Sequence, residues 1–197
     1  MDTRQTIITL LRDTQREGIE NAIVFLDDNG FFDYPASTRY QNREKGGLSN
    51  HSLLVYQFAM KLRDDAIAQN PEIEVLLPAD SVTIAALLHD TCKIFNYEQT
   101  GTTADGQPIF SHCYSFPAGH GEKSVFALLR TGLQLTDNEI LAIRWHMGKH
   151  ELCENIESQE NKEFHRALKL TPLCRLIQQA DVHATKYNLE TGENTLN

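Results

Sequence analysis

Hydrophobic side chains recur at helical spacing along most of the chain. Residues 7–12 and 18–26 have the pattern of two short amphipathic helices. A longer helix, capped by Ser49 or Asn50, is predicted to end at about Gln69, just before a proline. The sequence is therefore predicted to fold as an all-α or mainly α protein. Further helices are predicted at about residues 120–131, 136–148 and 170–190.

The helical period breaks in the segments between these helices. Residues 31–47 contain a proline and two adjacent glycines, which indicates a structured loop. Residues 95–117 predict a small β-hairpin, because segments of β type flank the turn sequence Asp105-Gly106. Residues 151–169 are polar, and the charge-rich stretch from 154 to 166 is interpreted as a solvated surface.

One predicted helix is apolar on every side and ends in two polar residues. The segment Val82–Leu88 contains a single polar side chain, that of Thr83, so the helix is expected to be buried. His89 and Asp90 follow directly. A buried carboxylate at the negative end of a helix is unfavourable, and a bound cation removes that objection. The pair therefore predicts a metal site.

Other histidines and one aspartate are also expected to face inward. His51 shares a helix face with hydrophobic residues three, four, seven and eleven positions later. His146 falls within the helix predicted from about 136, and His120 begins another helix. Asp181 lies on the apolar face of the last predicted helix. One such histidine is most often a hydrogen-bonded core residue, but several from different helices indicate a shared site.

Length and composition fit one domain. The chain has 197 residues, of which 41% are hydrophobic and 23% charged, as in an ordinary soluble globule. We predict a single domain over residues 1–197, with N-terminal helices at 1–30, a core at 31–190 and a tail at 191–197. The formal charge of −9 disfavours broad binding to duplex nucleic acid but allows a small anionic substrate at a metal site.

The cysteines and the absence of long apolar runs bear on location. Cys92, Cys113, Cys153 and Cys174 show no paired spacing of the kind that binds zinc. No apolar run approaches the ~20 residues of a membrane span, and no secretory segment is visible. A cytoplasmic protein with reduced thiols is therefore expected. Cys92 is interpreted as a small buried core residue.

The chain resembles a known family of hydrolases. Residues Phe31–Tyr40 followed by Gly46-Gly47-Leu48 are similar to an HD-domain subgroup found in bacterial and phage genomes. HD-type exoribonucleases are a related branch, although they commonly carry a histidine where this chain has Gln41. The resemblance to the HD-domain metal-dependent phosphohydrolases covers roughly residues 31–187 and rests on the order His51, His89, Asp90, His120, His146 and Asp181.

This resemblance implies a set of metal ligands. His51, His89, Asp90 and Asp181 would hold one ion. Asp90 would bridge to a second ion held by His120 and His146, unless these two histidines only hydrogen-bond the substrate. Imidazole and carboxylate ligands suit Mn, Fe, Co, Ni or Zn, with Mg possible at the second site.

Two basic residues are candidates for contacts with a phosphoryl group. Lys93, three residues after Asp90, would stabilise developing charge, so Asp90 and Lys93 are the candidate catalytic residues. Arg39, in the loop before the His51 helix, can bind a phosphate in bidentate fashion. Together with Lys93, His120 and His146 it forms the candidate substrate-binding set. The simpler interpretations are a solvent-exposed lysine at a helix end and a surface arginine.

The expected function is hydrolysis of a phosphomonoester or phosphodiester, of a nucleotide or similar small metabolite, through a metal-activated water. Three alternatives stay open at this point. They are a single-strand exonuclease of the HD type, a di-iron oxygenase of the HD fold, and a non-catalytic sensor domain. The oligomeric state is left open.

Overall fold

The computed structural model of the protein describes residues 2–37, 43–113, 116–152 and 154–191. It confirms a mainly α fold with a small antiparallel hairpin. The helices are α1 (Thr3–Asp13), α2 (Ile19–Asp28), α3 (Gly47–Gln69), α4 (Ala79–Leu88), α5 (His120–Arg130), α6 (Asp137–Arg144), α7 (Gln159–Leu170) and α8 (Pro172–Thr191). The 3-10 helices are η1 (Pro71–Leu76), η2 (Thr91–Phe95) and η3 (Gly148–Glu151), and the strands are β1 (Tyr97–Thr102) and β2 (Pro108–His112).

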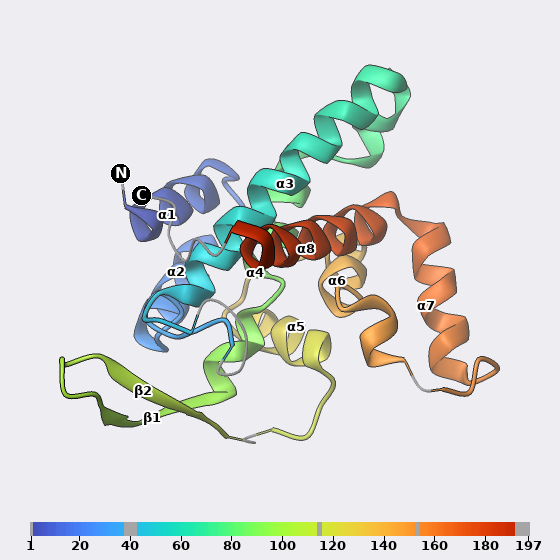
Figure 1. The fold of residues 1–197 in the computed structure, drawn as a ribbon. Coiled ribbons are helices and arrows are strands. Elements are labelled where there is room, and N and C mark those ends of the chain that lie inside the picture. The colour runs from blue at the N-terminus through green and yellow to red at the C-terminus, as the bar shows by residue number, and fades with distance from the viewer. Residues whose placement is uncertain (1, 38–42, 114–115, 153, 192–197) are drawn as a thin grey trace.

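Helix α4 runs through the middle of the bundle. Every residue from Ser81 to Asp90 is buried, and α1, α3, α6 and α8 pack around the helix. Figure 1 shows α3 and α8 crossing in front of it. This burial is what the nearly uninterrupted apolar run predicts. It brings the end of the helix, and with it His89 and Asp90, into the interior of the protein.

The predicted hairpin follows directly after η2. Its strands pair from Tyr97 opposite His112 to Thr102 opposite Pro108, with an irregularity between Gln99 and Gly101. The turn contains Gly106, whose φ of 87° lies in the left-handed region that favours glycine. The hairpin extends away from the helices at one end of the molecule (Figure 1).

The start of α3 differs from the prediction. Neither Ser49 nor Asn50 caps the helix, which begins at Gly47. The residue before it, Gly46, has a φ of 81° and leaves the helix without a side-chain cap. The Ser49 hydroxyl instead donates to the Gly46 carbonyl, at 2.9 Å. The helix therefore starts three to four residues earlier than the capping pattern suggests, and His51 sits one turn inside it.

The region after α6 also departs from the sequence-based expectation. The helix ends at Arg144 rather than near residue 148, and Trp145 takes the C-terminal cap position. Residues 151–169 contain a helix, α7, that was not predicted. This helix buries Phe164, Ala167 and the polar Asn161, so the charge-rich stretch is solvated on one face only. In the described part of the chain, no helix has the length and apolar character needed to cross a membrane.

A buried ion pair attaches the N-terminal helices to the bundle. The two Nη atoms of Arg16 lie 2.7 and 2.8 Å from the carboxylate of Glu139, whose side chain is fully buried. We expect Arg16→Ala to lower the free energy of unfolding by about 3 kcal/mol, because it leaves a buried carboxylate without its partner. Urea denaturation measures this. Arg12→Ala, which breaks an exposed pair with Glu20, serves as the control and should leave the unfolding midpoint unchanged.

Cys174, on α8, is fully buried. Burial raises the pKa of its thiol to about 12, so the reactive thiolate forms only as the pH approaches that value. We expect iodoacetamide at about pH 8.5 to modify the half-buried Cys113 well before Cys174 in the folded protein. Peptide mass spectrometry measures the two rates. Equal rates in the folded protein would contradict the burial of Cys174, whereas equal rates in urea are expected.

Candidate metal centre

Asp90 lies at the centre of a group of ionisable side chains. Its Oδ1 is 2.7 Å from Nε2 of His120, and its Oδ2 is 2.6 Å from Nζ of Lys93. Burial would raise the pKa of Asp90, but the positive charges of Lys93 and His89 outweigh burial and hold that pKa well below its ordinary value. Asp90 is therefore a carboxylate at neutral pH, in a place where a carboxylate needs cations around it.

His89 and His146 each direct a ring nitrogen that has no hydrogen-bond partner among the described residues toward this carboxylate. Nδ1 of His89 donates to the Ala86 carbonyl at 2.8 Å, and Nδ1 of His146 donates to the Ile143 carbonyl at 2.7 Å. Because a carbonyl only accepts, Nδ1 carries the hydrogen and Nε2 of the neutral ring carries a lone pair. These Nε2 atoms lie 3.3 and 3.4 Å from Asp90 but form no hydrogen bond within the described residues.

The nitrogen and oxygen atoms that meet at Asp90 favour a bound cation. Two buried lone pairs and a carboxylate that approach one another repel unless a positive charge lies between them. Burial lowers the pKa of His89, but the charges of Asp90 and Asp181 outweigh burial and raise it, so the surroundings of this ring favour a positive charge. The donor set of imidazole nitrogens and carboxylate oxygens is the one that divalent transition metals prefer. The residues present therefore fit a metal ion.

His51 and Asp181 extend the group on its other side. Helix α3 supplies His51 and helix α8 supplies Asp181, and His51 Nε2 lies 3.1 Å from Asp181 Oδ1 and 3.7 Å from Asp90 Oδ2. Burial would raise the pKa of Asp181, but the hydrogen bond and charge of His51 lower it. His51, His89 and Asp181 offer ligand atoms that all lie within 4.8 Å of one another. A second such set comprises His89, Asp90 and His146.

His120 belongs to a third set, together with Asp90 and Cys92. Burial lowers the pKa of His120 despite its hydrogen bond to Asp90, which favours the neutral ring. The Cys92 sulfur lies 3.4 Å from His120 Nε2. Cys92 is therefore a buried core residue, as predicted, that also contacts a candidate metal ligand. Burial raises the pKa of the Cys92 thiol to about 12, which keeps it protonated.

Lys93 points into this group and is not an exposed lysine at a helix end. Its side chain is 18% exposed. Burial lowers the pKa of Lys93, but the charge of Asp90 outweighs burial and raises it, so the ammonium form persists at neutral pH. The candidate phosphate ligand Arg39 lies outside the described residues.

The loop after α6 positions His146. The prediction placed His146 within a helix, but it lies two residues beyond Arg144, where the chain turns toward η3. His150, four residues after His146, is exposed on η3. Gly148 has a φ of 55°, and a Cβ there would lie 1.5 Å from the Gln178 amide nitrogen. The Gln178 side chain can move aside, so glycine is favoured at this position by the left-handed backbone conformation.

Arg144, the last residue of α6, contacts the first turn of α5, the helix that begins with His120. Its Nε lies 2.8 Å from Oε1 of Glu122, and Oε2 of Glu122 accepts from the Gly119 backbone N–H at 3.0 Å. The guanidinium also lies 3.9 Å from the centroid of the Trp145 ring. Sequence reasoning missed this role of Arg144, because the contact joins residues 22 positions apart that no local pattern relates.

The structure thus brings the sequence-based metal candidates to one place, and their binding of metal stays a prediction.

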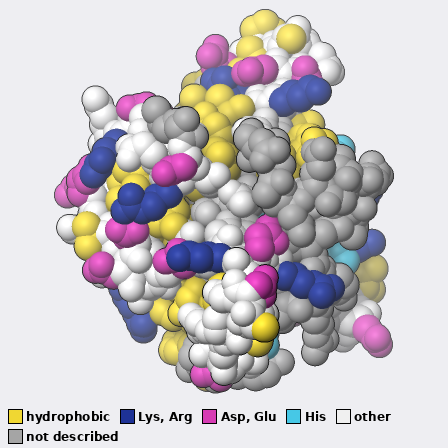
Figure 2. Space-filling model, turned by 60° about the vertical axis from the view of Figure 1, so that its left-hand side comes forward, with side chains coloured by type: hydrophobic (Ala, Val, Ile, Leu, Met, Phe, Trp, Pro, Cys, Tyr) yellow, Lys and Arg dark blue, Asp and Glu magenta, His cyan; other side chains and the backbone are white. Residues whose placement is uncertain are grey.

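The face of the molecule in Figure 2 shows Lys and Arg side chains scattered among Asp and Glu rather than gathered in one broad basic patch. Among the coloured, described residues of this face, no continuous positive surface of the kind that binds duplex nucleic acid is seen.

Comparisons with known proteins show the family to which the chain belongs. The family model described as HD domain matches residues 48–186, which include all six candidate ligands. A curated relative, the dihydroneopterin 2′,3′-cyclic phosphate phosphodiesterase of Methanocaldococcus jannaschii, is 30% identical over 118 residues. That alignment covers 59% of this chain and 43% of the relative, so the chain spans less than half the relative's length. No solved structure matches. The chain belongs to the HD domain family.

Proposed function

We propose that the protein is a metal-dependent phosphohydrolase that cleaves a phosphodiester or phosphomonoester of a small nucleotide-like molecule. The observation that carries the proposal is the pair of buried Nε2 atoms, of His89 and His146, that face the Asp90 carboxylate without hydrogen bonds in the described structure. Such an arrangement is costly unless it binds a cation.

The three overlapping groups of donors suggest where ions would bind. Asp90 belongs to two of the groups, one with His89 and His146 and one with Cys92 and His120. As the family resemblance implies, His51, His89, Asp90 and Asp181 would hold one ion, and His120 and His146 would hold another that shares Asp90. A bound divalent ion lowers the pKa of water and neutralises phosphoryl oxygens. The carbonyl hydrogen bonds to Nδ1 of His89 and His146 hold both rings with Nε2 directed at the site.

Lys93 would stabilise the charge that develops on the phosphoryl group or on the leaving oxygen. We expect Lys93→Met to lower kcat about 100-fold, the cost of removing one preorganised donor, while the metal content stays at the wild-type level. Lys149→Met, at an exposed position, is the matched control and should keep both kcat and metal content at the wild-type level. Loss of metal together with turnover in Lys93→Met would instead place the lysine among the groups that hold the site together.

The substrate class rests on the relative's printed activity and on the site's chemistry. The M. jannaschii protein is named as a phosphodiesterase of a 2′,3′-cyclic phosphate attached to a pterin. A strained cyclic phosphodiester on a nucleoside or a similar heterocycle is therefore the first substrate class that we propose for this chain.

A substrate panel tests the proposal. It comprises 2′,3′-cyclic and 3′,5′-cyclic nucleotides, nucleoside monophosphates and short single strands, each with added Mn²⁺. We expect turnover of cyclic or monoester substrates that EDTA abolishes. Turnover confined to single strands would favour an exonuclease, and no turnover by a metal-loaded protein on any member would contradict the proposal.

A further inference from the structure

Four phenylalanine rings line a cavity of about 310 Å³ away from the metal centre. Phe25 comes from α2, Phe95 from η2, Phe126 from α5, and Phe116 from the segment before α5. The ring centroids of Phe25 and Phe95 are 6.3 Å apart, and those of Phe116 and Phe126 are 6.5 Å apart. Phe116 and Phe126 are 43% and 44% exposed, so these rings do not simply complete the hydrophobic core.

Two cationic side chains complete the lining. The Arg130 guanidinium lies 5.7 Å from the centroid of the Phe116 ring, and the described residues give it no ion pair. Nζ of Lys123 donates to Oδ1 of Asn96 at 3.0 Å, which leaves two ammonium hydrogens for other acceptors. Among the described lining residues there is no carboxylate. The charged groups in the lining, Arg130 and Lys123, are both positive, although the chain as a whole has a formal charge of −9, and this favours an anionic ligand over a cationic one.

We propose that this cavity is a second binding site, for a small ligand that combines a planar aromatic ring with an anionic group. Its volume lies at the lower end of the range of about 300–1,000 Å³ for small-molecule sites. Phenyl rings stack on a planar ring, and Arg130 and Lys123 supply charge-assisted hydrogen bonds to the anion. Mononucleotides are one example of this ligand class.

The site is separate from the metal centre but shares two elements with it. On α5, Lys123, Phe126 and Arg130 are spaced three and four residues apart and so lie on one face of the helix. Arg130 is ten residues, or about 15 Å along the helix axis, from His120. The 3-10 helix η2 carries both Phe95 of this cavity and Lys93 of the metal centre. The proposal does not depend on the proposed function.

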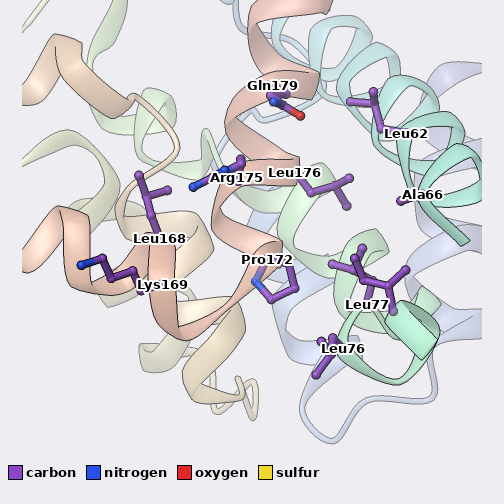
Figure 3. A pocket seen from close by; sticks show the side chains of 11 residues that line it. Leu62, Ala66, Leu76, Leu77, Leu168, Lys169, Pro172, Arg175, Leu176 and Gln179 are labelled. Atoms are coloured by element: carbon purple, nitrogen blue, oxygen red, sulfur yellow. The ribbon is translucent and has the colours of Figure 1, made fainter. Parts of the chain in front are cut away.

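A second groove supplies a matched control. Apolar side chains line it between α3, η1 and the corner where α7 meets α8, and Figure 3 shows Arg175 beside Leu176 on its α8 side. No phenylalanine lines this groove among the described residues. It therefore offers an exposed arginine next to apolar side chains without the ring cluster.

The test compares two fluorescent probes on the full-length protein. The anionic probe is 8-anilinonaphthalene-1-sulfonate, and the neutral probe, N-phenyl-1-naphthylamine, has the same rings without the sulfonate. We expect Arg130→Glu to weaken binding of the anionic probe at least about tenfold and that of the neutral probe less than about twofold. Phe126→Ser should weaken both probes. Arg175→Glu and Leu129→Ser, at exposed positions outside the cavity, should change neither.

Several results would overturn the proposal. One is anionic-probe binding that Arg130→Glu leaves unchanged or weakens no more than Arg175→Glu does. Another is an equal loss of both probes in Arg130→Glu, because the arginine would then have no role in recognising charge. A change in molar mass in solution on Phe126→Ser would show that a second copy of the chain covers the cavity. Asp90→Asn should retain the binding of both probes. The binding test can therefore be interpreted even if the proposed hydrolase function is wrong.

Discussion

Replacing Asp90 with asparagine is expected to remove the bound metal and to lower turnover at least about a thousandfold. Asparagine keeps the size of the side chain but removes the charge to which His120 and Lys93 are directed, at 2.7 and 2.6 Å. Breaking a buried charge cluster costs about 3–5 kcal/mol, and about 4 kcal/mol of lost transition-state stabilisation corresponds to a thousandfold in rate. Elemental analysis and steady-state kinetics on the same preparation measure both effects.

Asp80→Asn is the matched control for this substitution. Asp80 is exposed in the first turn of α4, the same helix that leads into Asp90. The control should keep wild-type metal content and turnover. If Asp90→Asn also retained wild-type metal content and turnover, the Asp90 carboxylate would be neither a metal ligand nor needed for catalysis.

Gly121→Ala is expected to destabilise the fold and to lower activity together. A Cβ at Gly121 would lie 2.2 Å from the Arg144 carbonyl oxygen and 2.6 Å from that of Ile143, and backbone atoms cannot move aside cheaply. We expect the free energy of unfolding to fall by about 3 kcal/mol, at the upper end for overpacking. Since His120 precedes Gly121, a shift of α5 by about 1 Å should lower turnover about 100-fold.

The control for this prediction is another glycine-to-alanine change, Gly101→Ala in β1. A Cβ there meets only the Ile109 side chain at 3.7 Å, an ordinary van der Waals distance. The backbone of Gly101 does not have a positive φ, so alanine can adopt the same conformation. Denaturation midpoints and kcat should match the wild type. Wild-type turnover in Gly121→Ala would mean that the close contact of α5 with α6 does not position His120.

Much of the fold could be predicted because the signals were local. A single polar residue, Thr83, within Val82–Leu88 was enough to predict a buried helix, and α4 is buried throughout. The Asp105-Gly106 pair predicted the hairpin turn in the same way. The bounds of other elements depended on less local causes. The start of α3 follows from the left-handed backbone of Gly46, which competes with the capping preference of Ser49.

The limits of sequence reasoning at the site have a similar origin. Residue chemistry and spacing identified the six candidate ligands, and the structure gathers them around Asp90, though metal binding itself stays a prediction. The apolar Trp145 continued a helical pattern that the chain leaves at Arg144, so the turn carrying His146 was missed. Helix α7 was missed because its buried face includes a polar residue, Asn161. The contact of Arg144 with Glu122 exists only after folding.

The most direct test of the metal-dependent mechanism is a Mn²⁺ titration of EDTA-treated protein, followed by release of p-nitrophenol from bis(p-nitrophenyl) phosphate. We predict no release without metal, a saturable rise as Mn²⁺ is added to the wild type, and no rise for Asp90→Asn. Equal release by the metal-free wild type, or the same rise in Asp90→Asn, would contradict the assignment of this site as a metal-dependent hydrolytic centre.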